Sequence, residues 1–203
     1  MSIDLWLYDI STSHSDFPDN LSTLKMRDFS IAMRTKILAT LLNKNINDIT
    51  FSKTNSGKPY VKDNGGLRFN VSHTGTLWGM AVSYNDTEVG LDIEKARERK
   101  YMKEMMEEYF HPSEVSYYKR LQTKPTQTEL FYKLWTQKEA YAKYLGQGLG
   151  YSYSEKYFLN GFHKHENIIS GLLLRLRPEK NTINLTVVSS ALVLSAEIVN
   201  FLV

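Results

Sequence analysis

The run from residue 89 to residue 94, Val-Gly-Leu-Asp-Ile-Glu, repeats with a period of two and is the most informative segment of the chain. Successive side chains of a β-strand point to opposite faces of the sheet. One face of this run therefore carries its apolar side chains, Val89, Leu91 and Ile93. The other face carries Gly90, Asp92 and Glu94. We expect a strand whose apolar face lies in a core and whose second face presents two neighbouring carboxylates.

The two carboxylates require a compensating charge. At about 7 Å apart, like charges repel by roughly 2 kcal/mol at an effective dielectric constant near 20. A hard divalent cation such as Mg²⁺ would compensate them, because magnesium binds one or two carboxylates and keeps positions for water and substrate phosphate. The alternative is a solvated edge strand whose acids pair with Lys95 and Arg97.

Apolar spacing and turn residues divide the rest of the chain into strands and helices. Strands are expected at 3–10, 49–52, 67–72, 77–84, 88–94, 156–159, 168–175, 182–189 and 192–199. Helices are expected at 24–43, 101–110, from residue 112 onward, and 129–145, the last ending at Gly146. A charged run at 95–100 marks a boundary. The pattern predicts an α+β fold divided into 1–95 and 96–203, each part with helices packed on an antiparallel sheet.

A helix over 129–145 would place Trp135, Glu139 and Lys143 on one face, because residues four apart are neighbours on a helix. Trp135 would anchor that face, Glu139 could complete a set of metal ligands, and Lys143 could reach an anionic substrate. The alternative is an ordinary Glu139–Lys143 pair beside a core tryptophan, worth a few tenths of a kcal/mol.

Two turns carry polar groups that suit phosphate. The segment Phe69-Asn-Val-Ser-His-Thr-Gly75 ends a strand with hydroxyls, an imidazole and backbone amides that could face phosphate oxygens. Its alternative is a capped hairpin with a surface histidine. The rigid turn Gly57-Lys-Pro59 carries Lys58, which could bind phosphate as a point charge or be an ordinary exposed lysine.

Composition excludes several classes of site. The 203-residue chain has no cysteine, which rules out disulfides, thiolate zinc sites, iron–sulfur clusters and a cysteine nucleophile. The N-terminus does not read as a signal peptide, and no apolar stretch approaches the about 18 residues of a membrane-spanning helix. A net charge of +3 suits anionic partners without indicating nucleic acid. We therefore expect a soluble, cytoplasmic protein.

The order of the four motifs resembles that of the 4′-phosphopantetheinyl transferase superfamily, specifically its larger, surfactin-synthetase-activating (Sfp-type) branch. The matching motifs are Gly57-Lys-Pro59, Phe69-Asn-Val-Ser-His73, residues 89–94, and Trp135-x-x-Lys-Glu-Ala-x-x-Lys143. The resemblance implies two similar α+β lobes related by a pseudo-twofold axis, with coenzyme A in the cleft between them. It also implies a monomer.

The resemblance further implies a role for each matching residue. Asp92, Glu94 and Glu139 match the ligands of Mg²⁺, for which Mn²⁺ is a possible substitute. Glu139, Lys143 and His73 match residues at the reacting groups. The coenzyme A contacts would be Lys58, Ser72, His73, Lys143 and Arg34. Family members also use basic residues before and within the first helix to bind the 3′-phosphate. The match to the family is weak in this region, so Lys25 and Arg27 are further candidates beside Arg34.

The implied activity is that of a holo-[acyl-carrier-protein] synthase type enzyme. It would transfer the 4′-phosphopantetheine of coenzyme A to a serine of an apo acyl or peptidyl carrier protein and release 3′,5′-ADP. Two alternatives use the same residues: a magnesium-dependent nucleotide pyrophosphate hydrolase, and a non-catalytic module that binds coenzyme A or a carrier. No nucleic acid or membrane partner is expected. Phe110, Tyr117 and Tyr118 could form a carrier-docking surface, although core packing is the favoured reading.

Overall fold

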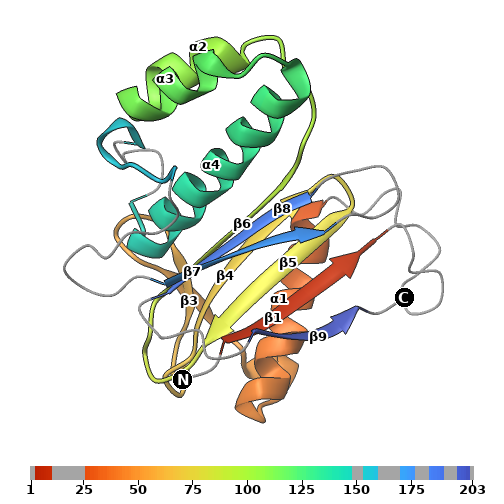
Figure 1. Cartoon of the computed structure of the whole chain (residues 1–203). Coiled ribbons are helices and arrows are strands. Elements are labelled where there is room, and N and C mark those ends of the chain that lie inside the picture. The colour runs from red at the N-terminus through yellow and green to blue at the C-terminus, as the bar shows by residue number, and fades with distance from the viewer. Residues whose placement is uncertain are drawn as a thin grey trace.

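The computed structural model describes residues 3–10, 26–147, 153–159, 170–176, 183–189 and 196–201. Within this part of the chain the fold is α+β, as predicted, with a four-stranded sheet, a three-stranded sheet and a two-stranded hairpin (Figure 1). None of the helices in these ranges is both long enough and apolar enough to cross a lipid bilayer.

The four-stranded sheet has the order β4-β5-β1-β9. Its strands are β1 (Ile3–Asp9), β4 (Arg68–Thr74), β5 (Leu77–Ser83) and β9 (Ala196–Phe201). Strand β5 pairs antiparallel with both of its neighbours, whereas β9 runs parallel to β1. The last described strand of the chain therefore lies beside the first.

The three-stranded sheet has the order β6-β8-β7 and is antiparallel throughout. Its strands are β6 (Val89–Lys95), β7 (Ser170–Leu176) and β8 (Ile183–Ser189). Helix α4 (Lys124–Leu145) packs against β6 and β8 (Figure 1). The apolar residues of β6 are buried with side chains of β1, β5 and β8: Val89, Leu91 and Ile93. The predicted apolar face of this strand is thereby confirmed.

The two sheets meet where β4 runs beside β6, and side chains join them. Three backbone N–H groups of β6 donate to side-chain oxygens at every second position of β4. The pairs are Leu91 to Asn70 (2.9 Å), Ile93 to Ser72 (3.2 Å) and Lys95 to Thr74 (3.1 Å). Buried backbone donors without partners are costly, so these side chains take the place of a neighbouring strand. The junction fixes the polar residues of β4 against the acidic strand.

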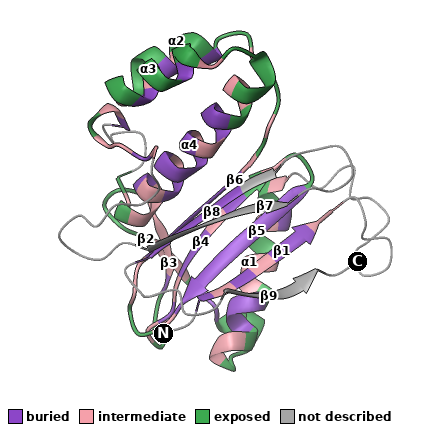
Figure 2. Ribbon diagram, in the orientation of Figure 1, coloured by how far each residue is buried: buried purple, intermediate pink, exposed green. Residues whose placement is uncertain are grey.

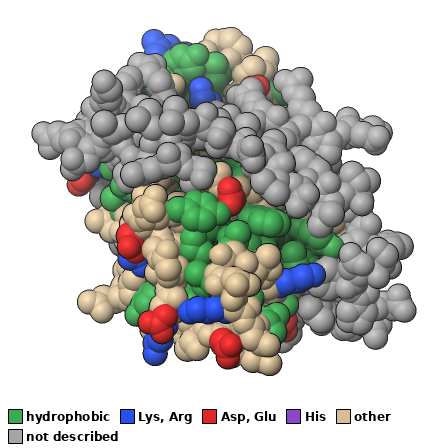
Figure 3. Space-filling model, turned by 90° about the horizontal axis from the view of Figure 1, so that it is seen from below, with side chains coloured by type: hydrophobic (Ala, Val, Ile, Leu, Met, Phe, Trp, Pro, Cys, Tyr) green, Lys and Arg blue, Asp and Glu red, His purple; other side chains and the backbone are tan. Residues whose placement is uncertain are grey.

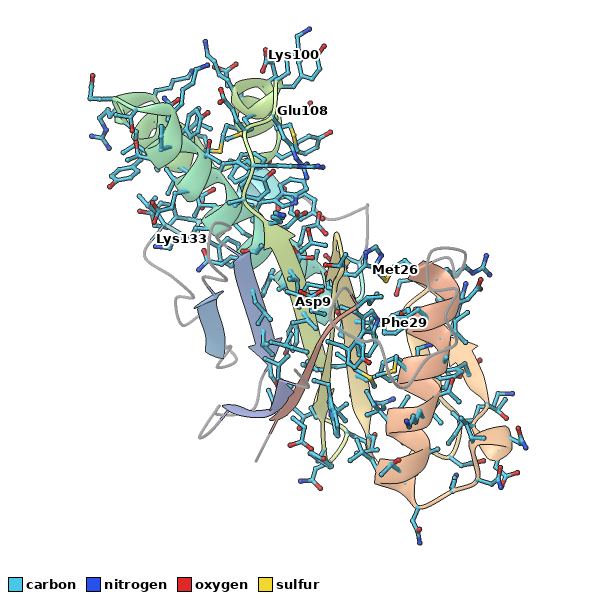
Figure 4. All side chains as sticks on the ribbon, turned by 90° about the vertical axis from the view of Figure 1, so that its right-hand side faces the viewer. Asp9, Met26, Phe29, Lys100, Glu108 and Lys133 are labelled. Atoms are coloured by element: carbon cyan, nitrogen blue, oxygen red, sulfur yellow. The ribbon has the colours of Figure 1, made fainter. Side chains whose placement is uncertain are left out.

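Helix α1 (Met26–Leu42) packs beside the larger sheet, at the far end of the molecule from α2 and α3 (Figures 1 and 4). Phe29 lies against Trp78 of β5 with ring centroids 6.1 Å apart, and the Trp78 indole donates to Ser30 Oγ at 3.0 Å. The buried residues of α1 face inward while its other side is exposed (Figure 2). The hairpin of β2 (Phe51–Lys53) and β3 (Pro59–Val61) completes this core.

A third core lies among α2 (Met102–Tyr109), α3 (Pro112–Arg120) and α4. His111 and Glu114 form a capping box at the start of α3. Gly146, at φ 68°, ends α4 in the left-handed conformation that glycine adopts readily. The predicted helix stop at this residue is confirmed.

Three expectations about local structure differ from what is found. Helix α4 begins at Lys124 rather than residue 129, because the Thr123 side chain caps it and a proline occupies its first turn. Strand β3 was not predicted. The strand predicted at 156–159 is wrong: the 3₁₀ helix η3 (Tyr153–Glu155) is followed by residues without regular structure. Parts of other predicted segments, including 24–25, 168–169, 182 and 192–195, lie outside the described residues.

Strands β6 and β9 connect the two parts of the chain that the sequence predicted as separate. Strand β6 precedes the predicted boundary at residue 95 but pairs with β8, and β9 follows the boundary but pairs with β1. The parallel pairing of β9 also departs from the all-antiparallel sheets expected. The division into 1–95 and 96–203 stays a prediction.

Candidate active site

Strand β6 lies directly against the C-terminal half of α4, and Gly90 makes this approach possible. A Cβ atom at Gly90 would lie 2.0 Å from the carbonyl oxygen of Ala140 and 2.5 Å from the backbone nitrogen of Tyr144. Backbone atoms cannot turn aside as a flexible side chain can. The glycine therefore brings the acidic face of β6 close to Glu139 and Lys143 on the helix.

We expect Gly90→Ala to destabilise the protein by about 1–3 kcal/mol, the usual cost of overpacking a core. Urea unfolding measures the change, and Gly90→Val should cost more than Gly90→Ala because its larger side chain displaces α4 further. An alanine variant as stable as the unmodified protein would contradict the close contact between the strand and the helix.

Lys143, Asp92 and Ser72 form the centre of the site. The Lys143 ammonium donates to Asp92 Oδ1 at 2.6 Å and to Ser72 Oγ at 3.2 Å, and the Ser72 hydroxyl lies 3.0 Å from the same Asp92 oxygen. The second oxygen, Asp92 Oδ2, is buried and has no hydrogen-bond partner among the described residues. The structure thus brings together three residues that the sequence assigned to one site, from β4, β6 and α4.

Glu94 and Glu139 lie in the same partly buried region. Burial, and next the charge of Asp92, raise the pKa of both carboxyl groups above its usual range. Arg99 lies 3.7 Å from Glu94 and opposes the shift there, together with Lys143. Both glutamates therefore feel the charge of Asp92, which a bound cation would compensate.

The acids have the chemistry of a magnesium site, although not its finished geometry. All are oxygen ligands, as Mg²⁺ prefers, and the buried Asp92 Oδ2 is an acceptor that a cation would satisfy. As their side chains stand, no three His, Cys, Asp or Glu residues in the described ranges are grouped closely enough to hold an ion. The shared site of Asp92, Glu94 and Glu139 stays a prediction.

Two residues that sequence reasoning did not assign support this site, Lys138 from α4 and Tyr153 from η3. Lys138, which precedes Glu139, is fully buried and pairs with the equally buried Glu114 of α3 at 2.9 Å. Tyr153 donates from its hydroxyl to Glu139 Oε1 at 3.0 Å. Burial and the Glu139 carboxylate raise the pKa of the Tyr153 phenol. Lys138 stands within the Trp-x-x-Lys-Glu motif, which is the one sequence signal that could have found it.

The end of strand β4 presents Ser72 and His73 to different neighbours. Ser72 faces the acids, whereas the exposed His73 lines a cavity of about 510 Å³ between α1 and the β2–β3 hairpin. Three further basic residues line this cavity: Arg27, Arg34 and Lys53. Arg34 stacks over the Phe51 ring at 4.5 Å, and burial lowers the pKa of its guanidinium. The cavity therefore suits an anionic group. Lys25, the other predicted candidate, lies outside the described residues.

Lys58 connects its turn to the site rather than standing free. Its ammonium lies 2.5 Å from Glu88 Oε2 and donates to the carbonyl oxygens of Val89 at 3.1 Å and Tyr144 at 3.3 Å. The turn is thereby tied to the start of β6 and the end of α4. The predicted contact between Lys58 and the coenzyme would require one of these acceptors to be exchanged.

A second cavity, of about 560 Å³, is lined by Arg99, which lies 3.7 Å from Glu94, and is mainly basic, with Glu98 as an acidic lining residue. Its cationic lining residues are Arg99, Lys100, Lys103 and Lys124, of which Figure 4 labels Lys100 near α2. By contrast, the face seen in Figure 3 intersperses acidic and basic side chains around apolar ones. In the lining of both cavities the cationic side chains outnumber the acidic ones, and Glu98 of the second cavity is paired with Lys124 at 2.9 Å.

The aromatic residues proposed as a docking surface belong mostly to the core. Phe110 and Tyr118 are buried, and only Tyr117 is exposed, at 40%. Phe110 packs on Trp135 of α4 with ring centroids 6.0 Å apart. The core reading is confirmed for Phe110 and Tyr118.

Two family models match the sequence. One, described as the 4′-phosphopantetheinyl transferase superfamily, covers residues 88–187, and the other, described as 4′-phosphopantetheinyl transferase, N-terminal, covers residues 21–85. Together they contain every motif singled out above.

Similar curated proteins carry the same description. The 4′-phosphopantetheinyl transferase HetI of Nostoc sp. is 27% identical over 72% of this chain and 70% of its own length. The transferase gsp of Aneurinibacillus migulanus is 36% identical over 56% of this chain and 45% of its own length. The transferase Sfp of Bacillus subtilis is 35% identical over 50% of this chain and 43% of its own length. The matched part of the chain thus spans less than half the length of the last two relatives.

Proposed function

This chain belongs to the 4′-phosphopantetheinyl transferase superfamily, and from that membership we propose that it transfers the 4′-phosphopantetheine group of coenzyme A to a serine of a carrier protein. The observation that carries the proposal is the contact of Lys143 with Asp92 at 2.6 Å, beside Ser72. Segments far apart in the sequence thereby bring the Lys143 ammonium and the Asp92 carboxylate together beside Ser72. The next residue, His73, lines the basic cavity.

The reaction proposed is a displacement at phosphorus. The carrier serine oxygen forms a bond to the β-phosphorus of coenzyme A, the bond from that phosphorus to the bridging oxygen breaks, and 3′,5′-ADP leaves. The serine proton passes to the Glu139 carboxylate, directly or through water. Such transfers are catalysed mainly by positioning the groups and stabilising charge.

Residues of this chain would supply most of that stabilisation. The Lys143 side chain is 29% exposed, so its ammonium can turn toward a pyrophosphate oxygen while staying near Asp92. Ser72 adds a hydroxyl at the same place. Magnesium, or manganese in its place, held by Asp92, Glu94 and Glu139 would neutralise charge on the pyrophosphate and the leaving group.

The coenzyme would extend past the end of β4, with its 3′-phosphate in the basic cavity of Arg27, Arg34, Lys53 and His73. The second cavity, whose lining includes Arg99, Lys100 and Lys103, is suited to an acidic surface of the carrier. The proposal includes a monomer acting in the cytoplasm on acyl or peptidyl carriers. It also includes two pseudo-twofold-related lobes that meet near the β4–β6 junction.

Mass spectrometry of purified apo carriers incubated with coenzyme A and Mg²⁺ tests the proposed function. A phosphopantetheine mass gain with release of 3′,5′-ADP is the expected result. Release of 3′,5′-ADP with an unmodified carrier would replace the proposal by pyrophosphate hydrolysis. Binding of coenzyme A or carrier without turnover would indicate a binding module instead.

We expect Arg34→Ala to raise the KM for coenzyme A about 10-fold with little change in kcat, because a charge-assisted contact is worth about 1.5–3 kcal/mol. Steady-state kinetics with coenzyme A and with 3′-dephospho-coenzyme A measure the effect. The KM values of Arg34→Ala and the unmodified protein should differ much less with 3′-dephospho-coenzyme A. Lys36→Ala, an exposed change on the same helix, is the control. An equal loss with both substrates would remove Arg34 from the 3′-phosphate site.

A further inference from the structure

Tyr153 reaches the site from outside the helix that carries Glu139. Its hydroxyl donates to Glu139 Oε1 at 3.0 Å from the short 3₁₀ helix η3. The side chain is buried, and its ring packs 5.9 Å from Trp135 and 6.5 Å from Tyr109, measured between centroids. Since neighbouring rings fix the tyrosine ring, they also fix the position of its hydroxyl.

A buried cation holds the backbone of Tyr153 in place. The Lys138 ammonium donates to the carbonyl oxygens of Tyr153 at 2.8 Å and Lys156 at 2.6 Å while pairing with Glu114. Glu114 in turn accepts a hydrogen bond from the backbone N–H of Phe158 at 2.6 Å. The turn of α4 that bears Glu139 therefore also anchors the segment that bears Tyr153.

A carboxylate needs such a partner to be held in one orientation. The last torsion of a glutamate side chain has a broad energy profile, so the group rotates easily unless one oxygen is bound. Residues that orient a metal ligand commonly matter about 10–100-fold for metal affinity or activity. A hydroxyl fixed by ring packing and by an anchored backbone is well suited to that purpose.

We propose that Tyr153 is a positioning residue that orients the Glu139 carboxylate for binding the divalent cation and for carrier loading. The proposal rests on the transferase function and on Glu139 acting in it. It names a residue outside the four motifs, in a short 3₁₀ helix for which the sequence predicted no structure. Tyr153 acts through Glu139 and makes no contact with the reacting groups itself.

The test compares Tyr153→Phe with Tyr132→Phe. The first substitution keeps the ring and the backbone carbonyl bound by Lys138 and removes only the hydroxyl. The second removes a buried hydroxyl that has no hydrogen-bond partner in the described part of the chain, so it controls for the loss of a buried phenol. Each variant is assayed for carrier loading, and its Mn²⁺ affinity is measured by electron paramagnetic resonance without carrier.

For Tyr153→Phe we expect kcat to fall about 10-fold and Mn²⁺ binding to weaken about 10-fold, with the KM for coenzyme A within about twofold. Tyr132→Phe should change none of these. An unchanged kcat, an unchanged Mn²⁺ affinity or equal losses in both variants would overturn the positioning role of Tyr153. The transferase proposal would stand. If the unmodified protein loads no carrier, the transferase proposal fails first and this inference with it.

Discussion

Asp92→Asn is expected to lower the rate of carrier loading by at least about 1000-fold, because a transition state would lose several kcal/mol of charge stabilisation. The amide cannot pair with Lys143 as a carboxylate does, and it is a poor ligand for a hard cation. The mass-shift assay with purified carrier measures the loss. Turnover near that of the unmodified protein would refute the assignment of Asp92.

The same variant should keep its stability or gain some. Burial, and next the charge of Asp92, raise the pKa of Glu94 and Glu139, so the Asp92 carboxylate repels both glutamates in the folded protein. Asparagine relieves that repulsion, and the loss of the 2.6 Å ion pair with Lys143 is offset because the amide oxygen can still accept from an ammonium that is 29% exposed to water. The thermal unfolding midpoint of Asp92→Asn is compared with that of Asp86→Asn. Asp86 is a surface acid that pairs with Arg68. A midpoint clearly below that of the control would mean that Asp92 is mainly structural.

Local patterns predicted the parts of the site that depend on local structure. The period of two in residues 89–94 identified a strand with one apolar face, and spacing of four placed Trp135, Glu139 and Lys143 on one helix face. Both readings need only the geometry of a single element. The meeting of Lys143 with Asp92 then followed from the order of the motifs rather than from any spacing.

Features that depend on how elements pack could not be predicted. The role of Gly90 becomes clear only from the packing of α4 against β6, because glycine can occur in a strand for several different structural reasons. The alternate side chains of β4 that bind the edge of β6 require the register between two sheets. The predicted strand at 156–159 failed for a related reason: a buried lysine, not a neighbouring strand, binds its backbone carbonyl at Lys156.

Lys138→Met is expected to destabilise the protein by about 3–5 kcal/mol, because removing one partner of a buried ion pair leaves an uncompensated charge. Lys138 and Glu114 have side chains that are both 0% exposed, and the ammonium also binds two carbonyl oxygens. Methionine fills much of the space but satisfies none of these acceptors. For a chain of this size, the thermal midpoint should fall by on the order of 10 °C.

Two further variants show whether the buried charge causes this loss. Lys133→Met makes the same change on the same helix at a partly exposed position (Figure 4), and should shift the midpoint little. Adding Glu114→Gln to Lys138→Met removes the orphaned charge, so the double variant should be more stable than the sum of the single losses predicts. Strictly additive losses would mean that the two side chains contribute independently. In that case Lys138 would hold the carbonyl oxygens of Tyr153 and Lys156 without help from Glu114.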